Sequence, residues 1–320
     1  MKTKGQTHRE AFDPTELLTS PRHPVRIGAW NVRTMWETGK TAQALKEMKD
    51  YKISILGLSE TRWTQQGKLG TAEGGLMCWS GRQDDHHAEG VALIMDKHSK
   101  KCLMEWKPIS SRLIQARFFT KFAKLTIIQC YAPTEMAAQE TKEEFYSQLQ
   151  EAISTVSSHD VLIVMGDLNA KIGSDNSGYE RNIGRHGLGP LRNDNGEKFL
   201  DLCVENNLVI GGTLFKHKDI HKATWNSPDG RTKNQIDHVA INGRWRSSLQ
   251  DVKTIRGAEL DSDHHLVLCK LKLKLKKMKK PTSPRILDSS RLKDVAVKEA
   301  FSIELSNRFH ALSEMPAKGE

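Results

Sequence analysis

The chain has 320 residues and a mass of 36.1 kDa, which allows one or two domains with a core of ordinary size. Lysine and arginine number 49 against 39 aspartates and glutamates, and the net charge of +10 favours a polyanionic partner. The five cysteines lack zinc-site spacing and are odd in number, and the longest apolar runs are only strand-length. The composition therefore argues against a zinc site, a disulfide framework and a transmembrane helix, and favours a reducing compartment.

The chain has three regions that differ in composition and sequence pattern. Residues 1–24 mix charges and prolines and lack the apolar run of a signal peptide, which predicts a flexible leader and an intracellular, non-secreted protein. Residues 25–275 alternate strand-like and helix-like patterns and form the expected main domain. Residues 276–287 are typical of a basic linker, and residues 288–320 are expected to form a helical tail.

Short β-rich runs dominate the main domain and predict the following strands: Val25–Trp30, Ile53–Leu58, Val91–Met95, Leu113–Phe119, Leu125–Tyr131, Val161–Met165, Ile236–Ile241 and Leu266–Leu273. Helices are expected at Thr41–Lys49, Glu143–Ser157 and Glu197–Asn206. Thr141 and Glu144 have the spacing of a capping box before the second helix. Many strands with few helices predict an α/β fold of stacked sheets covered by helices.

Polar residues follow apolar strands at several points. Asn31, Glu60, Tyr131 and Asp167 each come at the end of such a run, and Asn169 lies two positions after Asp167. Strand ends hold polar groups rigidly at a sheet edge that water and substrate can reach. A single strand that ends in Asp or Asn is more often the start of a turn, so the interpretation depends on the whole set.

The set resembles the endonuclease/exonuclease/phosphatase superfamily, the fold of DNase I and of exonuclease-III-type endonucleases, in six ordered motifs: WNVRT, SETRW, YAPT, GDLN, IDH and SDHH. Their spelling is most similar to the endonuclease domain of RTE-type non-LTR retrotransposons. The resemblance implies a four-layered α/β sandwich of two packed mixed sheets flanked by helices. It also implies an endonuclease that hydrolyses phosphodiester bonds and nicks duplex DNA. The tail resembles the linker that precedes a reverse transcriptase.

The resemblance also implies a metal site. Glu60, helped by Asn31, would hold Mg²⁺, which prefers hard oxygen ligands and retains several waters; Mn²⁺ can substitute for it. Asp263 falls where some relatives place a second metal-associated carboxylate. An N-cap or loop role for Asp263 is the alternative.

Five residues receive catalytic roles from the resemblance. Asp167 would accept a proton from the attacking water, which Asn169 would orient. Asp237 would fix the tautomer of His264 and raise its pKa, so that His264 stabilises the charge that builds on the scissile phosphate. Tyr131 would contact the phosphate or its neighbours, although a role as a core aromatic is the alternative.

DNA is the expected partner, with no membrane involved, and the expected protein is a nuclear monomer. Arg33 and Arg62 follow two of the motifs, and Trp225 precedes IDH at a spacing that resembles the DNA-groove loop of the family. We expect these three residues to bind substrate. The alternating lysines from Lys270 to Lys274 fit either an edge strand with lysines facing water or a DNA contact.

Two other functions stay open. An abasic-site repair endonuclease is one alternative, but Asn234 stands where repair enzymes carry a Trp that frames the base-free sugar. Arg33 and Thr134 also depart from the repair-enzyme pattern. The other alternative is a co-opted DNA- or protein-binding module without turnover.

Overall fold

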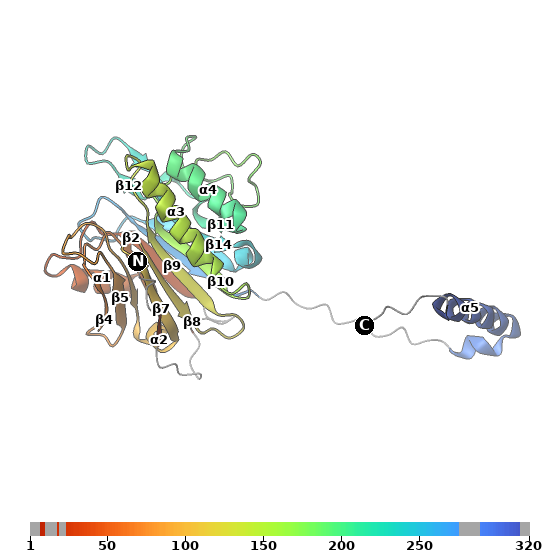
Figure 1. Ribbon diagram of the computed structural model, residues 1–320. Helices are drawn as coiled ribbons and strands as arrows, with labels where there is room; N and C mark the ends of the chain where they lie inside the picture. Colours follow the sequence, from red (N-terminus) through yellow and green to blue (C-terminus); the bar gives the residue numbers. More distant parts are fainter. Residues whose placement is uncertain (1–6, 10–17, 19–23, 275–288, 314–320) are drawn as a thin grey trace. The chain divides into compact units, whose positions relative to one another are not determined.

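The computed structural model in Figure 1 describes residues 7–9, 18, 24–274 and 289–313. The chain divides into two compact units, Met1–Lys274 and Leu275–Glu320. Most of the predicted leader and the whole predicted linker 276–287 lie outside the described residues. Within the second unit, helix α5 spans Val295–Ser313.

Two seven-stranded mixed sheets make up the first unit. The first sheet has the order β1 (His8–Arg9), β7 (Leu103–Ser110), β8 (Leu113–Phe118), β9 (Leu125–Tyr131), β10 (Val161–Asp167), β14 (Asp237–Asn242), β11 (Leu208–Ile210). The second sheet has the order β15 (Leu249–Ile255), β16 (Leu266–Leu271), β2 (Val25–Asn31), β3 (Ile55–Ser59), β6 (Val91–Met95), β5 (Leu76–Ser80), β4 (Gln66–Gly70). A short hairpin of β12 (Trp225–Asn226) and β13 (Lys233–Asn234) forms a separate two-stranded sheet, and an isolated bridge between Trp225 and His264 connects it to the segment before β16.

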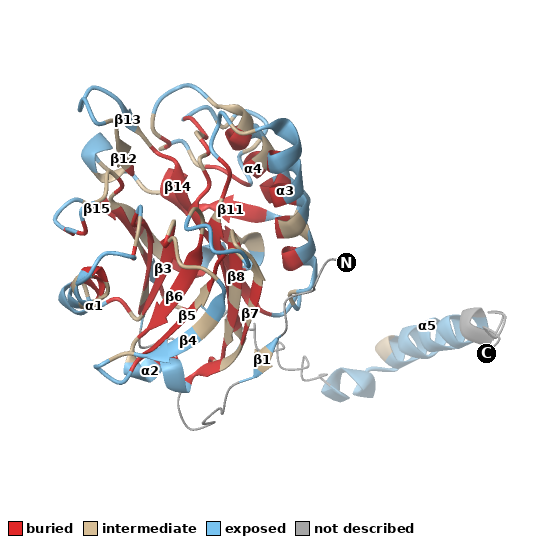
Figure 2. Cartoon of the chain, turned by 60° about the vertical axis from the view of Figure 1, so that its left-hand side comes forward, coloured by how far each residue is buried: buried red, intermediate tan, exposed pale blue. Residues whose placement is uncertain are grey.

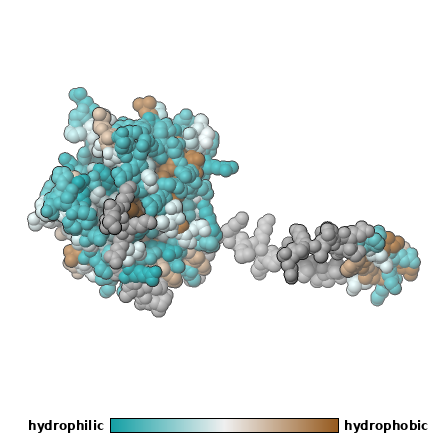
Figure 3. All heavy atoms as spheres, viewed as in Figure 1, coloured by the Kyte–Doolittle hydropathy of each residue, from teal (hydrophilic) through white to brown (hydrophobic). Residues whose placement is uncertain are grey.

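The helices of this unit are α1 (Lys40–Asp50), α2 (Lys97–Lys101), α3 (Gln139–Ser154) and α4 (Asp194–Glu205). In Figure 1, α3 and α4 lie side by side over the first sheet, and α1 lies on the side of the second sheet. The outward face in Figure 3 is largely hydrophilic, as expected for solvated helices and loops. Among the residues the structure places, no helix has both the length and the apolar character needed to cross a membrane.

Three hydrophobic layers hold the unit together. Ile27 and Ile163, from the two sheets, share the core between the sheets. Val164, the neighbour of Ile163 on β10, packs instead in the layer under α3 and α4. Leu56 and Ala44 belong to the layer between the second sheet and α1. The central strands therefore bury both faces, as Figure 2 shows, and the predicted four-layered α/β sandwich is confirmed.

The predicted edge strand at the alternating lysines is wrong, because β16 lies between β15 and β2. The run that forms β15, LQDVKTI, was not predicted as a strand, and it covers the edge that β16 would otherwise expose. Lys270 is exposed and Leu271 is buried, as the period of two requires. The alternation of lysine and leucine therefore correctly indicated a strand, but it did not indicate that this strand lies inside the sheet.

Helix α3 begins four residues before the predicted start, at Gln139. The predicted capping box is wrong, since Ala138 is the N-cap residue, it makes no side-chain cap hydrogen bond, and Thr141 lies inside the helix. A tertiary contact favours the longer helix: the buried Lys142 donates from Nζ to Asp194 Oδ2 at the start of α4, at 3.0 Å.

Candidate active site

The sheet topology brings the predicted residues to one place. Strands β2 and β3 are parallel, as are β9 and β10, so each pair ends at a common edge. Strands β14 and β16 run antiparallel to β10 and β2, so they begin where those strands end. The polar side chains of one site therefore lie at the ends of β2, β3, β9 and β10 and at or just before the starts of β14 and β16.

Asn31 joins the two sheets at this edge. Its Nδ2 donates to Asp167 Oδ2 at 2.8 Å and to Glu60 Oε2 at 3.2 Å. Its Oδ1 accepts from the backbone N–H of Arg33 at 2.9 Å. The Asn31 amide thus bonds to two carboxylates, one at the edge of each sheet, and fixes the positions of both.

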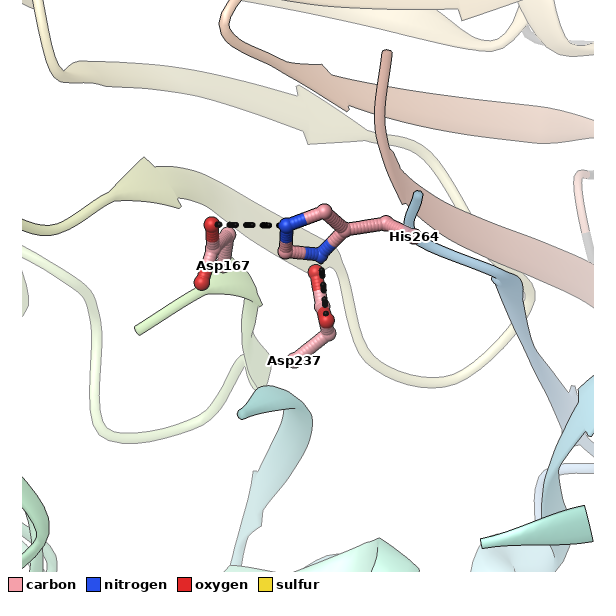
Figure 4. Close-up of side chains that lie close together, drawn as sticks. All are labelled: Asp167, Asp237 and His264. Atoms are coloured by element: carbon pink, nitrogen blue, oxygen red, sulfur yellow. Dashed lines mark hydrogen bonds and ion pairs between the residues drawn. The ribbon is translucent and has the colours of Figure 1, made fainter. Parts of the chain in front are cut away.

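His264 lies between two aspartates, as Figure 4 shows. Its Nδ1 is 2.9 Å from Asp237 Oδ2, and its Nε2 is 3.9 Å from Asp167 Oδ2. All three side chains are buried. Burial alone lowers the pKa of His264, but the charges of Asp237 and Asp167 outweigh it and raise this pKa above its ordinary value. Burial, and then the charge of Asp237, raises the pKa of Asp167 against the opposing effect of His264.

Backbone and side-chain contacts outside the predicted set hold this histidine. Trp30 Nε1 donates to His264 O at 3.0 Å, and Ser262 Oγ accepts from His264 N at 3.1 Å while donating to Asn31 O at 2.7 Å. Thr224 Oγ1 accepts from the backbone N–H of Asp237 at 3.1 Å. Sequence reasoning assigned none of these supporting contacts, although Trp30, Thr224 and Ser262 stand inside or beside the quoted motifs.

Asn169 and Tyr131 face the same cavity. Asn169 is in the left-handed region at φ 48°, and its Nδ2 donates to Ala132 O at 3.0 Å. Arg112, another residue that the sequence did not single out, stacks over the Tyr131 ring at 5.1 Å. Burial, and then the charges of Glu60 and Asp167, raises the pKa of Tyr131 further above its ordinary value. The phenol therefore stays protonated and can donate a hydrogen bond.

A buried serine supports the site from below. Ser59 Oγ donates to Cys130 O at 2.7 Å and accepts from Gln129 Nε2 at 2.9 Å and from Asp167 N at 3.3 Å. These bonds cross from the second sheet to the first. Gly57, two residues earlier on β3, leaves the room that this network needs, since a Cβ there would lie 2.0 Å from Gln129 Oε1.

We expect Ser59→Ala to lower the free energy of unfolding by about 1–3 kcal/mol, because buried donors lose their acceptor. Urea unfolding of the variant and the wild type measures the difference. The exposed Ser158→Ala on the same chain is the matched control and should stay within about 0.5 kcal/mol of the wild type. Equal losses in both variants would show that the Ser59 network does not stabilise the fold.

The site opens into a cavity of about 530 Å³. Its lining combines the predicted residues Asn31, Glu60, Tyr131, Asp167, Asn169, Trp225 and His264 with Thr134, Glu135, Met136, Lys171, Asn193, Asn234 and Ile236. Trp225 and Asn234 are paired across the β12–β13 hairpin. The cavity therefore has a carboxylate-rich side and a wall made by this hairpin.

The remaining predicted residues lie beside the cavity rather than in its lining. Asp263 Oδ2 accepts from Trp225 Nε1 at 2.9 Å, and its Oδ1 is 3.7 Å from Arg33 Nε. Arg62 Nη2 donates to Glu60 Oε1 at 2.9 Å. The Asp263 carboxylate thus holds Trp225 and Arg33, whereas Arg62 balances the charge of Glu60.

The carboxylates around Asn31 fit a hard divalent cation. Glu60 and Asp167 present oxygen atoms to a single amide, and Glu60 keeps 17% of its side chain exposed at the cavity. Mg²⁺ is commonly held by one or two carboxylates and retained waters. Ligand atoms of Asp167, Asp237 and His264 also lie within 4.8 Å of one another. Since Asp237 already uses Nδ1 of His264, Glu60 and Asn31 are the better donors.

The two packed sheets and flanking helices form a DNase I-like α/β sandwich, and the site at their edge is similar to that of the endonuclease/exonuclease/phosphatase superfamily. A family model described as endonuclease-reverse transcriptase matches residues 125–268, which include Tyr131, Asp167, Asp237 and His264. Craniofacial development protein 2 of Tragulus javanicus is 39% identical over 283 residues, which is 88% of this chain and 48% of that relative. The chain thus spans about half the length of this curated relative.

Solved structures share the fold at low sequence identity. The endonuclease domain of TRAS1, a telomere-specific non-LTR retrotransposon, aligns with a TM-score of 0.55 and 15% identity, over 79% of this chain and 100% of that domain. The AP endonuclease LMAP from Leishmania major aligns with a TM-score of 0.57 and 13% identity, over 83% of this chain and 92% of the enzyme. These similarities show the shared fold, and the family match supports a nuclease-like function.

Proposed function

We propose that this chain is a Mg²⁺-dependent endonuclease that nicks duplex DNA. The observation that carries the proposal is the joint placement of Asn31, Glu60, Asp167 and the Asp237–His264 pair around one cavity. Hydrolysis of a phosphodiester needs a proton acceptor for water, donors for the developing phosphate charge and a cation site, and this arrangement offers each of them.

The roles of the residues follow from their contacts. Glu60 and Asn31 would hold Mg²⁺, which lowers the negative charge of the phosphate when it is bound. Asp167 would accept the proton of the attacking water, and Asn169, whose Nδ2 is engaged with Ala132 O, keeps its Oδ1 available to orient that water. His264 would donate from Nε2 to the phosphate while Asp237 holds Nδ1.

We also propose that this nuclease derives from a retrotransposon and resides in the nucleus. A retrotransposon origin is supported by the motif spelling and by the match to an endonuclease-reverse transcriptase family model. Nuclear residence and a monomeric state are proposals that rest on the DNA substrate and the basic sequence. We also propose that residues 25–275 are the nuclease domain, that residues 276–287 are a linker and that residues 288–320 are an accessory tail. If a variant that cannot cleave DNA kept its function in the cell, the alternative of a DNA- or protein-binding module would be favoured.

A supercoiled-plasmid nicking assay with Mg²⁺, with Mn²⁺ and with excess EDTA tests the activity. We expect nicked circles with either metal and none with EDTA. No nicking with any metal would contradict the proposed enzyme and favour a binding module.

Intact and abasic duplexes of the same sequence are expected to be nicked at comparable rates. The reason is that Asn234, a polar residue, faces Trp225 across the hairpin, so no second aromatic side chain frames a base-free sugar there. Initial rates on end-labelled duplexes measure the comparison. A rate on the abasic duplex far above that on the intact duplex would favour the repair endonuclease instead.

A further inference from the structure

Two aromatic rings contact each other at the surface, on loops that adjoin Asn31 and Glu60 of the candidate active site. Trp36 is 66% exposed, and its ring centroid lies 4.2 Å from that of the exposed His87, at an interplanar angle of 48°. Single exposed apolar side chains are common and need no explanation by themselves. This pair, which we call the aromatic platform, is different because of how it is held and what surrounds it.

The aromatic platform is fixed by loops that bond to one another. His87 Nδ1 is 2.8 Å from Arg62 O, and Trp36 N donates to Thr34 Oγ1 at 3.1 Å. Backbone bonds also connect Met35 N to Thr61 O at 2.9 Å and Arg62 N to Glu89 O at 2.7 Å. The two rings are therefore presented by a connected backbone rather than by independent loops.

Strained backbone marks the same loops. Arg33, Glu60 and Arg62 have φ values of 57°, 59° and 58°, in the left-handed region that residues other than glycine seldom adopt. Such conformations persist where the surrounding structure enforces them, and they cluster at functional sites. The loops that hold the platform are thus shaped at an energetic cost, which is typical of a binding surface.

Two arginines lie on the loops that carry the aromatic platform. Arg33 and Arg62 have 58% and 43% of their side chains exposed. Arg33 N donates to Asn31 Oδ1, and Arg62 pairs with Glu60, so both arginines contact residues that line the cavity. Exposed rings with adjoining arginines offer stacking surface for a base and donors for the neighbouring phosphates.

We propose that the aromatic platform stacks an unpaired nucleobase next to the scissile phosphate, while Arg33 and Arg62 bind the flanking phosphates. The inference rests on the proposed nuclease function and deepens it. The preferred substrate is then duplex DNA with a locally unpaired base near the cleavage point, such as a short bubble. A ring surface binds any base, so the preference is for unpaired structure rather than for sequence.

The test measures binding and cleavage separately, with the full chain. Fluorescence anisotropy in EDTA compares a fully paired duplex with a duplex of the same flanks that contains a short bubble. The variants are Trp36→Ala, Trp36→Phe and the control Phe122→Ala. Phe122 is a 50% exposed aromatic that precedes β9, at the sheet edge opposite to the end that carries Tyr131.

We expect the wild type and Phe122→Ala to prefer the bubble, and Trp36→Ala to bind it about 5- to 150-fold more weakly. Trp36→Phe should retain part of the preference because it keeps a ring. With Mg²⁺, Trp36→Ala should raise KM for the bubble more than it lowers kcat. If Trp36→Ala bound both duplexes with unchanged affinity, the proposed base stacking would be wrong, and contact with a protein partner would be favoured for the two rings.

The two proposals fail in different ways. A wild type that prefers the bubble in EDTA but never nicks DNA would overturn the nuclease and keep the platform. A wild type that nicks DNA while Trp36→Ala behaves identically would overturn the platform alone. Absence of binding to either duplex in EDTA, together with absence of nicking with Mg²⁺ or Mn²⁺, would overturn both.

Discussion

Asp167→Asn is expected to reduce plasmid nicking on the order of 10⁴-fold, near the upper limit for a positioned general base. An amide of the same shape cannot accept the proton of water, although it can still accept the hydrogen bond that Asn31 donates at 2.8 Å. Asp167 is buried and its backbone N–H donates to Ser59 Oγ, so we expect the asparagine to keep the position of the carboxylate. Initial nicking rates with Mg²⁺ measure the loss.

The stability of the same variant provides an independent readout. Folding raises the pKa of Asp167, chiefly through burial, so the ionised carboxylate costs stability at any pH above its folded-state pKa. The neutral amide avoids this cost, and the melting temperature at pH 8 should stay the same or rise. The exposed Asp201→Asn on α4 is the matched control and should preserve the nicking rate. An inactive variant that is also unfolded would remove the support for a catalytic role.

His264→Gln is expected to lower the nicking rate about 10²- to 10³-fold, the usual effect of removing one donor from a developing oxyanion. Asp237→Asn should produce a loss of similar size, because the 2.9 Å contact to Nδ1 fixes the tautomer and favours the charged ring. Residues that act as a unit are not additive, so the double variant should be little worse than either single one. Nicking rates of the three proteins measure this coupling.

A neighbouring histidine provides the control for this series. His265 is next in the chain, and its Nε2 is 2.8 Å from Asn226 Nδ2 instead of a carboxylate. His265→Gln should therefore nick DNA at nearly the wild-type rate. If the losses for His264→Gln and Asp237→Asn multiplied in the double variant, the two residues would be acting independently and the proposed pairing would be wrong.

The residues at the candidate site could be named from the sequence because six ordered motifs resemble a known superfamily, and most of these residues also follow or begin a strand with a strong local signal. The apolar run before Asp167 has the length of a buried strand, and the runs before Asn31 and Glu60 have the same character. Once the order of the motifs indicated a sandwich, the common sheet edge followed. The Asn31–Asp167 and Asp237–His264 hydrogen bonds connect residues of different motifs at that edge.

Other features depended on contacts between one segment and another. The place of β16 inside its sheet depends on β15, whose LQDVKTI run has too weak a pattern to predict, and β4 is mostly polar and forms only by pairing with β5. The start of α3 depends on a contact with α4. In each case the deciding interaction joins two segments, so the pattern of one segment alone does not predict the outcome.

The sequence by itself therefore predicted the fold class, through strand-length apolar runs and ordered motifs that resemble a known superfamily, and it named the residues of the candidate site through the same resemblance. Only the tertiary structure decided which partners each group meets. It placed Asp263 on Trp225 and Arg33, Ser59 beneath Asp167, and Trp36 against His87. These contacts join segments brought together by sheet pairing and loop closure, and hydrogen bonds across such distances leave no periodic trace in the sequence.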